Sequence, residues 1–75
     1  MTTELTIGQK LAGVQFNPTG DETIASLKQS FADVLDKVIA TAAGADPLQT
    51  KMYDKVVDDI MTAQMWAVKA FTWKL

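Results

Sequence analysis

The C-terminal part of this chain is hydrophobic on nearly every side of the helix that it is predicted to form. Between residues 61 and 73 the apolar side chains are Met61, Ala63, Met65, Trp66, Ala67, Val68, Ala70, Phe71 and Trp73. At about 100° of rotation per residue, these positions cover most of the helix circumference. A helix that is apolar all round is normally buried all round. Since the chain has room for only one other long helix, the sequence predicts that other copies or another protein cover the rest.

The small size of the chain points in the same direction. Its 75 residues form one domain at most, and a domain of this size buries only roughly 60% of its unfolded surface. The chain contains no cysteine and no histidine, so neither a disulfide nor a structural zinc ion is expected to stabilise it. We therefore expect a single domain over residues 1–75 that assembles into a compact homo-oligomer.

Residues 1–19 are predicted to form an N-terminal arm. Within it, Thr6 and Gln9 have the spacing of a capping box, which predicts a short helix over residues 7–12. Gly8 and Gly13 disfavour that helix. Residues 16–20, Phe-Asn-Pro-Thr-Gly, are typical of a turn, because the proline biases the residue before it away from helix.

Two long helices are expected after the arm. The first spans residues 21–43, where apolar residues recur at three- and four-residue steps: Ile24, Leu27, Phe31, Val34, Leu35, Val38 and Ile39. The second spans residues 47–74, with Asp46 as N-cap and Pro47 at the first helical position. The link over residues 44–46 is short, and short links join antiparallel neighbours. The predicted fold is therefore all-α, an antiparallel helical hairpin with an N-terminal arm.

The charges limit the kinds of partner. The net charge is −2 and every cation is a lysine, which argues against binding of long DNA or RNA, where many contacts to phosphate are needed. A small anionic ligand held by two or three lysines is compatible with this composition, although without arginine no bidentate contact to phosphate is available. The sequence also contains neither a run of 18 apolar residues nor a start typical of a secretory signal. We expect no membrane span and a cytoplasmic location.

Catalytic chemistry is not expected. Without histidine or cysteine, the sequence shows no pairing of a nucleophile with a base. Asp58 and Asp59 are adjacent on a predicted helix and point about 100° apart, so we interpret them as solvated acids and not as a metal or acid–base site. The prediction is a protein that is not an enzyme and needs no cofactor or metal.

Two groups of residues could contact a ligand. Asp58, Thr62, Trp66 and Lys69 fall within roughly 80° of one another on the second helix. There Trp66 is either an interface anchor, which we favour, or a stacking surface beside a cation.

Lys28 lies in the second turn of the first helix and follows the turn that contains Phe16. The helix N-terminus, this lysine and the aromatic ring could hold a phosphate and a base. Spacing alone favours the alternative, an exposed lysine and a core phenylalanine.

Two stretches of the chain resemble a known family. Residues 16–21 (FNPTGD), continuing to Leu27-Lys28 and residues 31–36 (FADVLD), form the first, and residues 62–73 (TAQMWAVKAFTW) form the second. Together with the lead-in at residues 5–10, they are similar to the helical-hairpin sponges that phages use against CBASS and Thoeris immunity. The resemblance covers most of the chain, and the C-terminal stretch is the more specific of the two.

This resemblance implies a compact hexamer in the host cytoplasm that sequesters cyclic di- or trinucleotide second messengers without degrading them. It implies pockets between subunits, in which an aromatic residue stacks on a base and a lysine meets phosphate. Phe16 and Lys28 match these positions, and Asn17 with the turn backbone would add hydrogen bonds. Lys69 matches a basic residue of a second pocket for trinucleotides. The alternative is a structural or protein-binding hairpin that acts on a host protein through the surface of Trp66 and Trp73.

Overall fold

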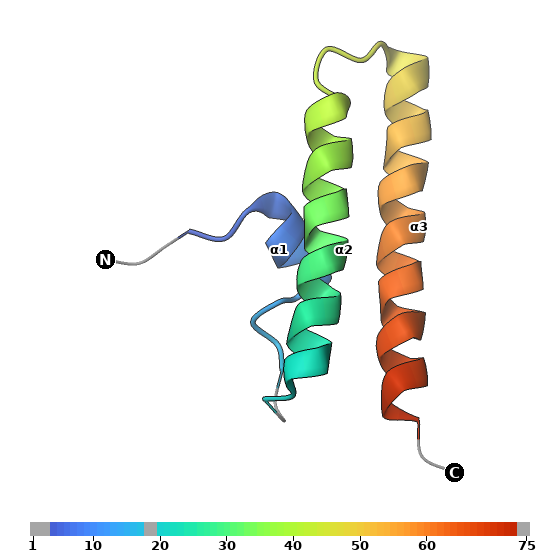
Figure 1. Ribbon diagram of the computed structural model, residues 1–75. Helices are drawn as coiled ribbons and strands as arrows, with labels where there is room; N and C mark the ends of the chain where they lie inside the picture. The colour runs from blue at the N-terminus through green and yellow to red at the C-terminus, as the bar shows by residue number, and fades with distance from the viewer. Residues whose placement is uncertain (1–3, 18–19, 74–75) are drawn as a thin grey trace.

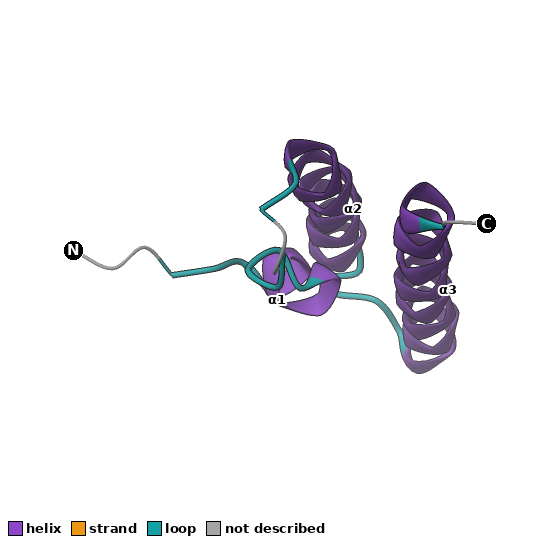
Figure 2. Cartoon of the chain, turned by 90° about the horizontal axis from the view of Figure 1, so that it is seen from below, coloured by secondary structure: helices purple, strands orange, loops and turns teal. Residues whose placement is uncertain are grey.

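The structure, a computed structural model that describes residues 4–17 and 20–73, consists of three helices (Figure 1). They are α1 (Ile7–Ala12), α2 (Glu22–Thr41) and α3 (Pro47–Thr72). Helices α2 and α3 lie side by side and run in opposite directions, joined by a short turn (Figure 1). Seen along the long helices, α1 lies against one side of this pair (Figure 2). The prediction of an all-α chain is confirmed.

The short helix α1 is held by its own capping box. The backbone N–H of Gln9 donates to the Thr6 hydroxyl oxygen at 3.1 Å, and the backbone N–H of Thr6 donates to the Gln9 side-chain oxygen at 2.9 Å. The helix ends at Gly13, whose φ of 68° lies in the left-handed region that favours glycine. The predicted helix over residues 7–12 is thus present, and Gly13 terminates it without interrupting it.

The long helices begin at the predicted caps. The Asp21 carboxylate accepts the N–H groups of Thr23 and Ile24, and Asp46 forms a capping box with Gln49. Pro47 occupies the first turn of α3. Helix α2 ends at Thr41, two residues before the predicted end at residue 43. The predicted end of the second helix at residue 74 lies outside the described residues.

A larger part of the core lies between α1 and α2 than the spacing of apolar residues had predicted. The buried residues of α2 are Ile24, Lys28, Ala32 and Leu35, whereas Val34, predicted for the apolar side, is 49% exposed. The cause is close packing of α1 on α2. A Cβ atom placed on Gly8 would lie 2.3 Å from the carbonyl oxygen of Ala32, so the absence of a side chain at Gly8 permits this contact.

Polar contacts fix α1 to both long helices. The Asp36 carboxylate of α2 accepts the backbone N–H of Gly8 at 2.7 Å and the hydroxyl of Thr6 at 2.6 Å. From α3, the buried Gln64 amide donates to the carbonyl oxygen of Ala12 at 3.2 Å. These three contacts join segments that lie far apart in the sequence, so they set where the arm after α1 runs.

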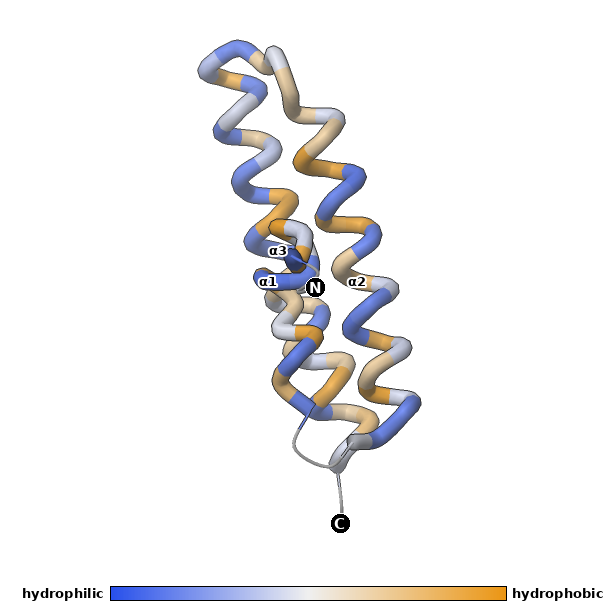
Figure 3. Tube along the Cα trace, turned by 90° about the vertical axis from the view of Figure 1, so that its left-hand side faces the viewer, coloured by the Kyte–Doolittle hydropathy of each residue, from blue (hydrophilic) through white to orange (hydrophobic). Residues whose placement is uncertain are grey.

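Helix α3 packs on one side only. Val57, Ile60 and Met61 contact the core, while several large apolar residues elsewhere on α3 are exposed, among them Leu48 (70%) and Trp66 (63%). Hydrophobic residues recur along the whole of α3 (Figure 3). The expectation of a helix that needs further cover agrees with this exposure. Among the described residues, no helix is long and apolar enough to cross a membrane.

Candidate ligand site

Lys28 is a buried cation in the middle of the core side of α2. Its side chain is only 7% exposed, because Lys28 follows Ile24 by one helical turn on the side that α1 and the arm cover. Its ammonium donates to the carbonyl oxygens of Phe16 and of Gly13, the latter at 3.3 Å. Both acceptors belong to the arm directly after α1, so the packing of α1 determines where this ammonium is held.

The Lys28 ammonium is held by carbonyl oxygens and not by a carboxylate of the described residues. Within residues 4–17 and 20–73, no carboxylate forms a salt bridge with it; the ion pair seen there joins Lys55 to Asp59. The two carbonyl oxygens accept hydrogen bonds from the ammonium but carry no net charge to neutralise it. A buried charge without a counter-ion is unfavourable, so this site favours an anion that comes close to it.

Phe16 lies over this cation with its ring open to solvent. The ring centroid is 5.3 Å from the Lys28 ammonium, and the residue is 74% exposed. The alternative with an exposed lysine and a core phenylalanine is therefore wrong, since the structure has the opposite arrangement. An exposed aromatic ring beside a cation offers a stacking surface for a planar, anionic ligand.

A hollow of about 300 Å³ opens next to these two residues. It is lined by Ala12, Gly13, Phe16, Lys28, Gln64, Met65 and Val68. The contribution of α3, from Gln64, Met65 and Val68, was not predicted. Its only sequence signal is that Val68 follows Gln64 by four residues and Met65 by three, so the three side chains share one side of α3.

Asn17 holds the turn that carries Phe16. Its side-chain amide donates to the carbonyl oxygen of Asp21 at 2.8 Å, which ties residue 17 to the N-cap of α2. In this arrangement Asn17 fixes the direction from which Phe16 approaches Lys28. Direct hydrogen bonds from Asn17 to a ligand remain a prediction.

Lys69 lies in a second cluster, on α3. Its ammonium is 5.1 Å from the ring centroid of Trp66 and 5.8 Å from that of Trp73. Trp66, Lys69, Ala70 and Trp73 line an open hollow of about 470 Å³. The structure thus brings Lys69 to Trp66, as the helical spacing predicted, and groups Phe16, Asn17 and Lys28 separately. Met65 lines both the hollow at Lys28 and a smaller one at Trp66 and Lys69.

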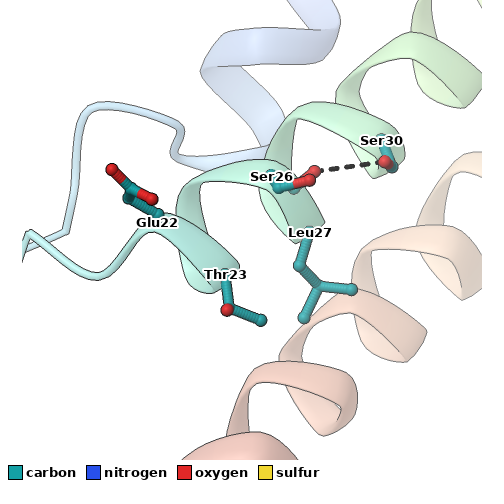
Figure 4. A pocket seen from close by; sticks show the side chains of 5 residues that line it. All are labelled: Glu22, Thr23, Ser26, Leu27 and Ser30. Carbon is teal, nitrogen blue, oxygen red and sulfur yellow. Dashed lines mark hydrogen bonds between the residues drawn. The ribbon is translucent and has the colours of Figure 1, made fainter.

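A third hollow lies beside the first turns of α2 and was not predicted (Figure 4). It has a volume of about 370 Å³ and is lined by Glu22, Thr23, Ser26, Leu27 and Ser30. The Ser30 hydroxyl donates to the backbone carbonyl of Ser26 at 3.1 Å (Figure 4). The Asp21 side chain already accepts the N–H groups of Thr23 and Ile24, so these donors are not directed at a ligand.

The described part of the chain shows no group of three or more acidic side chains that could hold a metal ion. Asp59 pairs with Lys55 at 2.8 Å, with both side chains more than half exposed, in agreement with the interpretation of Asp58 and Asp59 as solvated acids. What the described residues offer to a ligand is two lysine ammonium groups, those of Lys28 and Lys69, each beside an aromatic ring.

Comparison with known proteins returned no match: no family model, no curated protein and no solved structure is similar to this chain at the level required.

Proposed function

We propose that this chain sequesters cyclic di- or trinucleotide second messengers, as a homohexamer in the cytoplasm of a phage-infected cell, and does not cleave them. The proposal combines the resemblance of residues 5–36 and 62–73 to phage sponges with the arrangement of Phe16 and Lys28. The observation that carries it is the Lys28 ammonium, which is buried, unpaired with any carboxylate of the described residues and adjacent to an exposed ring.

A cyclic oligonucleotide fits the chemistry of this place. Its phosphodiester groups would supply the negative charge that Lys28 lacks, and a base would stack on the Phe16 ring. The hollow is mainly apolar on its α3 side, through Met65 and Val68. A ligand with a planar base and an anionic phosphate would therefore fit both the apolar and aromatic lining and the lysine of this hollow.

The side chains that are present support the proposal of binding without cleavage. The sequence holds no histidine, cysteine or arginine, and the lysine at the centre of the site is held by carbonyl oxygens. A protonated lysine in this setting neutralises a phosphate and does not activate water. The ligand should therefore be recovered intact after the complex is heated, and linear products would refute sequestration.

The test is a thermal-shift screen with cyclic dinucleotides, cyclic trinucleotides and cyclic ADP-ribose isomers. A ligand present at 100 times its Kd stabilises the folded protein by about 2.7 kcal/mol, which for a chain of this size raises Tm by roughly 10 °C or more. If no member of this panel shifts the wild-type protein, the proposed function is wrong.

Lys28→Met, with Lys37→Met as matched control, then locates the site. Methionine keeps much of the aliphatic stem of Lys28 and removes its charge, so we expect a folded protein that no longer shows the ligand shift. Lys37 is exposed on α2, and its variant should bind like wild type. An unchanged affinity of Lys28→Met would remove Lys28 from the site.

The second candidate is a hairpin that binds a host protein through Trp66 and Trp73. It is favoured by the exposure of these residues, 63% and 60%, which is unusual for tryptophan. It predicts that Trp66→Ala abolishes capture of a host protein while no nucleotide shifts Tm. The nucleotide panel therefore distinguishes the two functions.

A further inference from the structure

Most of the exposed apolar residues of α3, together with Trp73 at its C-cap, lie along one side of the helix as a stripe, whereas the exposed Met65 and Phe71 lie outside it. Leu48, Met52, Val56, Ala63, Trp66, Ala70 and Trp73 fall within roughly 100° of one another at 3.6 residues per turn. The stripe is exposed: Leu48 by 70%, Met52 by 65%, Val56 by 41% and Trp66 by 63%. It lies away from the side of α3 that contacts the core through Val57, Ile60 and Met61.

One ion pair interrupts this stripe. Lys55 donates to Asp59 at 2.8 Å, and both residues lie near the middle of α3, which spans Pro47–Thr72. The remaining positions are spaced by three, four or seven residues, and this spacing keeps them on one side of a helix that can pack against another helix. A partner for this surface must therefore cover apolar residues on both sides of a central pair of opposite charges.

We propose that the part of this stripe from Leu48 to Trp66 is the interface with a second copy of the chain, packed antiparallel to the first about a two-fold axis that crosses the stripe side of α3 at the level of residue 57. In that arrangement Lys55 of each copy faces Asp59 of the other, because both are two residues from the centre. The same symmetry sets Leu48 opposite Trp66 of the second copy, so a large apolar residue meets another. The overlap runs from about residue 47 to residue 67, roughly 30 Å of helix.

Charge selects this arrangement over the parallel one. Parallel packing in register would bring Lys55 to Lys55 and Asp59 to Asp59 of the second copy, and like charges at an interface are strongly unfavourable. The antiparallel pair instead extends the existing contact into a four-membered network of alternating charge. Carboxylate and ammonium groups each accommodate several hydrogen-bonding partners, so the contact within one chain need not break.

This inference rests on the assembly part of the proposed function and not on its ligand. Its test contains no nucleotide, so the proposed interface and the proposed nucleotide binding can each fail without the other. Sedimentation of the wild-type protein over a range of concentrations should show association. Lys55→Glu and Asp59→Lys should each weaken it about tenfold or more, because like charges then face each other across the interface.

Mixing these two variants should restore association, since each introduced charge then meets its opposite in the other chain. Asp33→Lys and Lys37→Glu are the matched controls. They have the same four-residue spacing on exposed positions of α2, and neither should change association, alone or mixed.

Cross-linking fixes the direction of packing, because the natural chain has no cysteine. A mixture of Leu48→Cys with Trp66→Cys should form a disulfide between the two variants under mild oxidation. Cross-linking of Leu48→Cys to itself would indicate parallel helices and overturn the proposal. A wild-type chain that stays monomeric, or an assembly indifferent to both charge reversals, would overturn it as well.

Discussion

Replacing Gly8 with alanine should loosen α1 from α2 and destabilise the protein, although alanine is the better helix former. The Cβ atom would lie 2.3 Å from the Ala32 carbonyl oxygen and 2.7 Å from the carboxylate carbon of Asp36. Both distances are much shorter than the ordinary contact distance of roughly 3.5 Å. Helix α1 would therefore have to move by roughly 1 Å.

Such a shift would lengthen the hydrogen bond from the Gly8 N–H to Asp36, now 2.7 Å, beyond hydrogen-bonding range. Loss of a hydrogen bond to a charged group costs about 1.5–3 kcal/mol, and crowding in a packed contact costs about 1–3 kcal/mol. The higher helix propensity of alanine returns at most about 1 kcal/mol. The net expectation is a loss of about 1.5–5 kcal/mol in the free energy of unfolding.

For a chain of this length that loss lowers Tm by at least about 6 °C. Circular dichroism during heating measures it, at one fixed protein concentration, since association makes Tm concentration-dependent. Lys10→Ala is the matched control, because Lys10 is exposed on the same helix, and surface changes of this kind stay within about 0.5 kcal/mol. A Gly8→Ala protein as stable as wild type, or more so, would show that α1 does not lie this close to α2 in solution.

Leu35→Ala should lower the free energy of unfolding by about 2–5 kcal/mol, because Leu35 is fully buried; an unchanged midpoint of urea unfolding would contradict the core described above. Gln64→Leu should cost about 1–2 kcal/mol by the same assay, since it leaves the Ala12 carbonyl oxygen without its donor from α3. The pKa of Lys55 is raised above 10.5, first by its hydrogen bond to Asp59 and then by Coulomb attraction. The pair therefore stabilises the helix below pH 10.5 and is lost as pH rises through the raised pKa. In an NMR titration the Lys55 ammonium should lose its proton at lower pH in Asp59→Asn than in wild type, and identical titration curves would show that the pair does not persist in solution.

The positions of the helices could be predicted from local signals alone. The capping box of Thr6 with Gln9 and the cap at Asp46 followed by Pro47 each mark a helix start, because their side chains satisfy backbone N–H groups that the helix leaves free. These contacts span only a few residues, so the sequence contains all the partners. The same reasoning overestimated the length of α2, which ends at Thr41.

The side of α2 that is buried could not be predicted as well. Of the positions that apolar spacing selected, Ile24 and Leu35 are buried, as predicted, but Val34 is half exposed. Lys28 and Ala32, which the spacing did not select, are buried as well. The reason is that α1 approaches α2 at Gly8 and Ala32, where small residues permit close contact. A pattern search scores large apolar side chains, so it misses an interface whose essential feature is the absence of side-chain volume.

The burial of Lys28 has a related cause. A lysine within an apolar helix is normally expected to extend its ammonium to water, and the sequence gives no sign that backbone carbonyls will receive it. Those carbonyls, of Gly13 and Phe16, reach Lys28 only because Gly13 ends α1 and turns the chain back over α2. The spacing between Phe16 and Lys28 suggested that they might share a pocket, but their relative burial depends on this long-range turn. The feature that best supports anion binding is therefore a consequence of how α1 packs, and the Gly8→Ala protein should lose ligand binding together with stability.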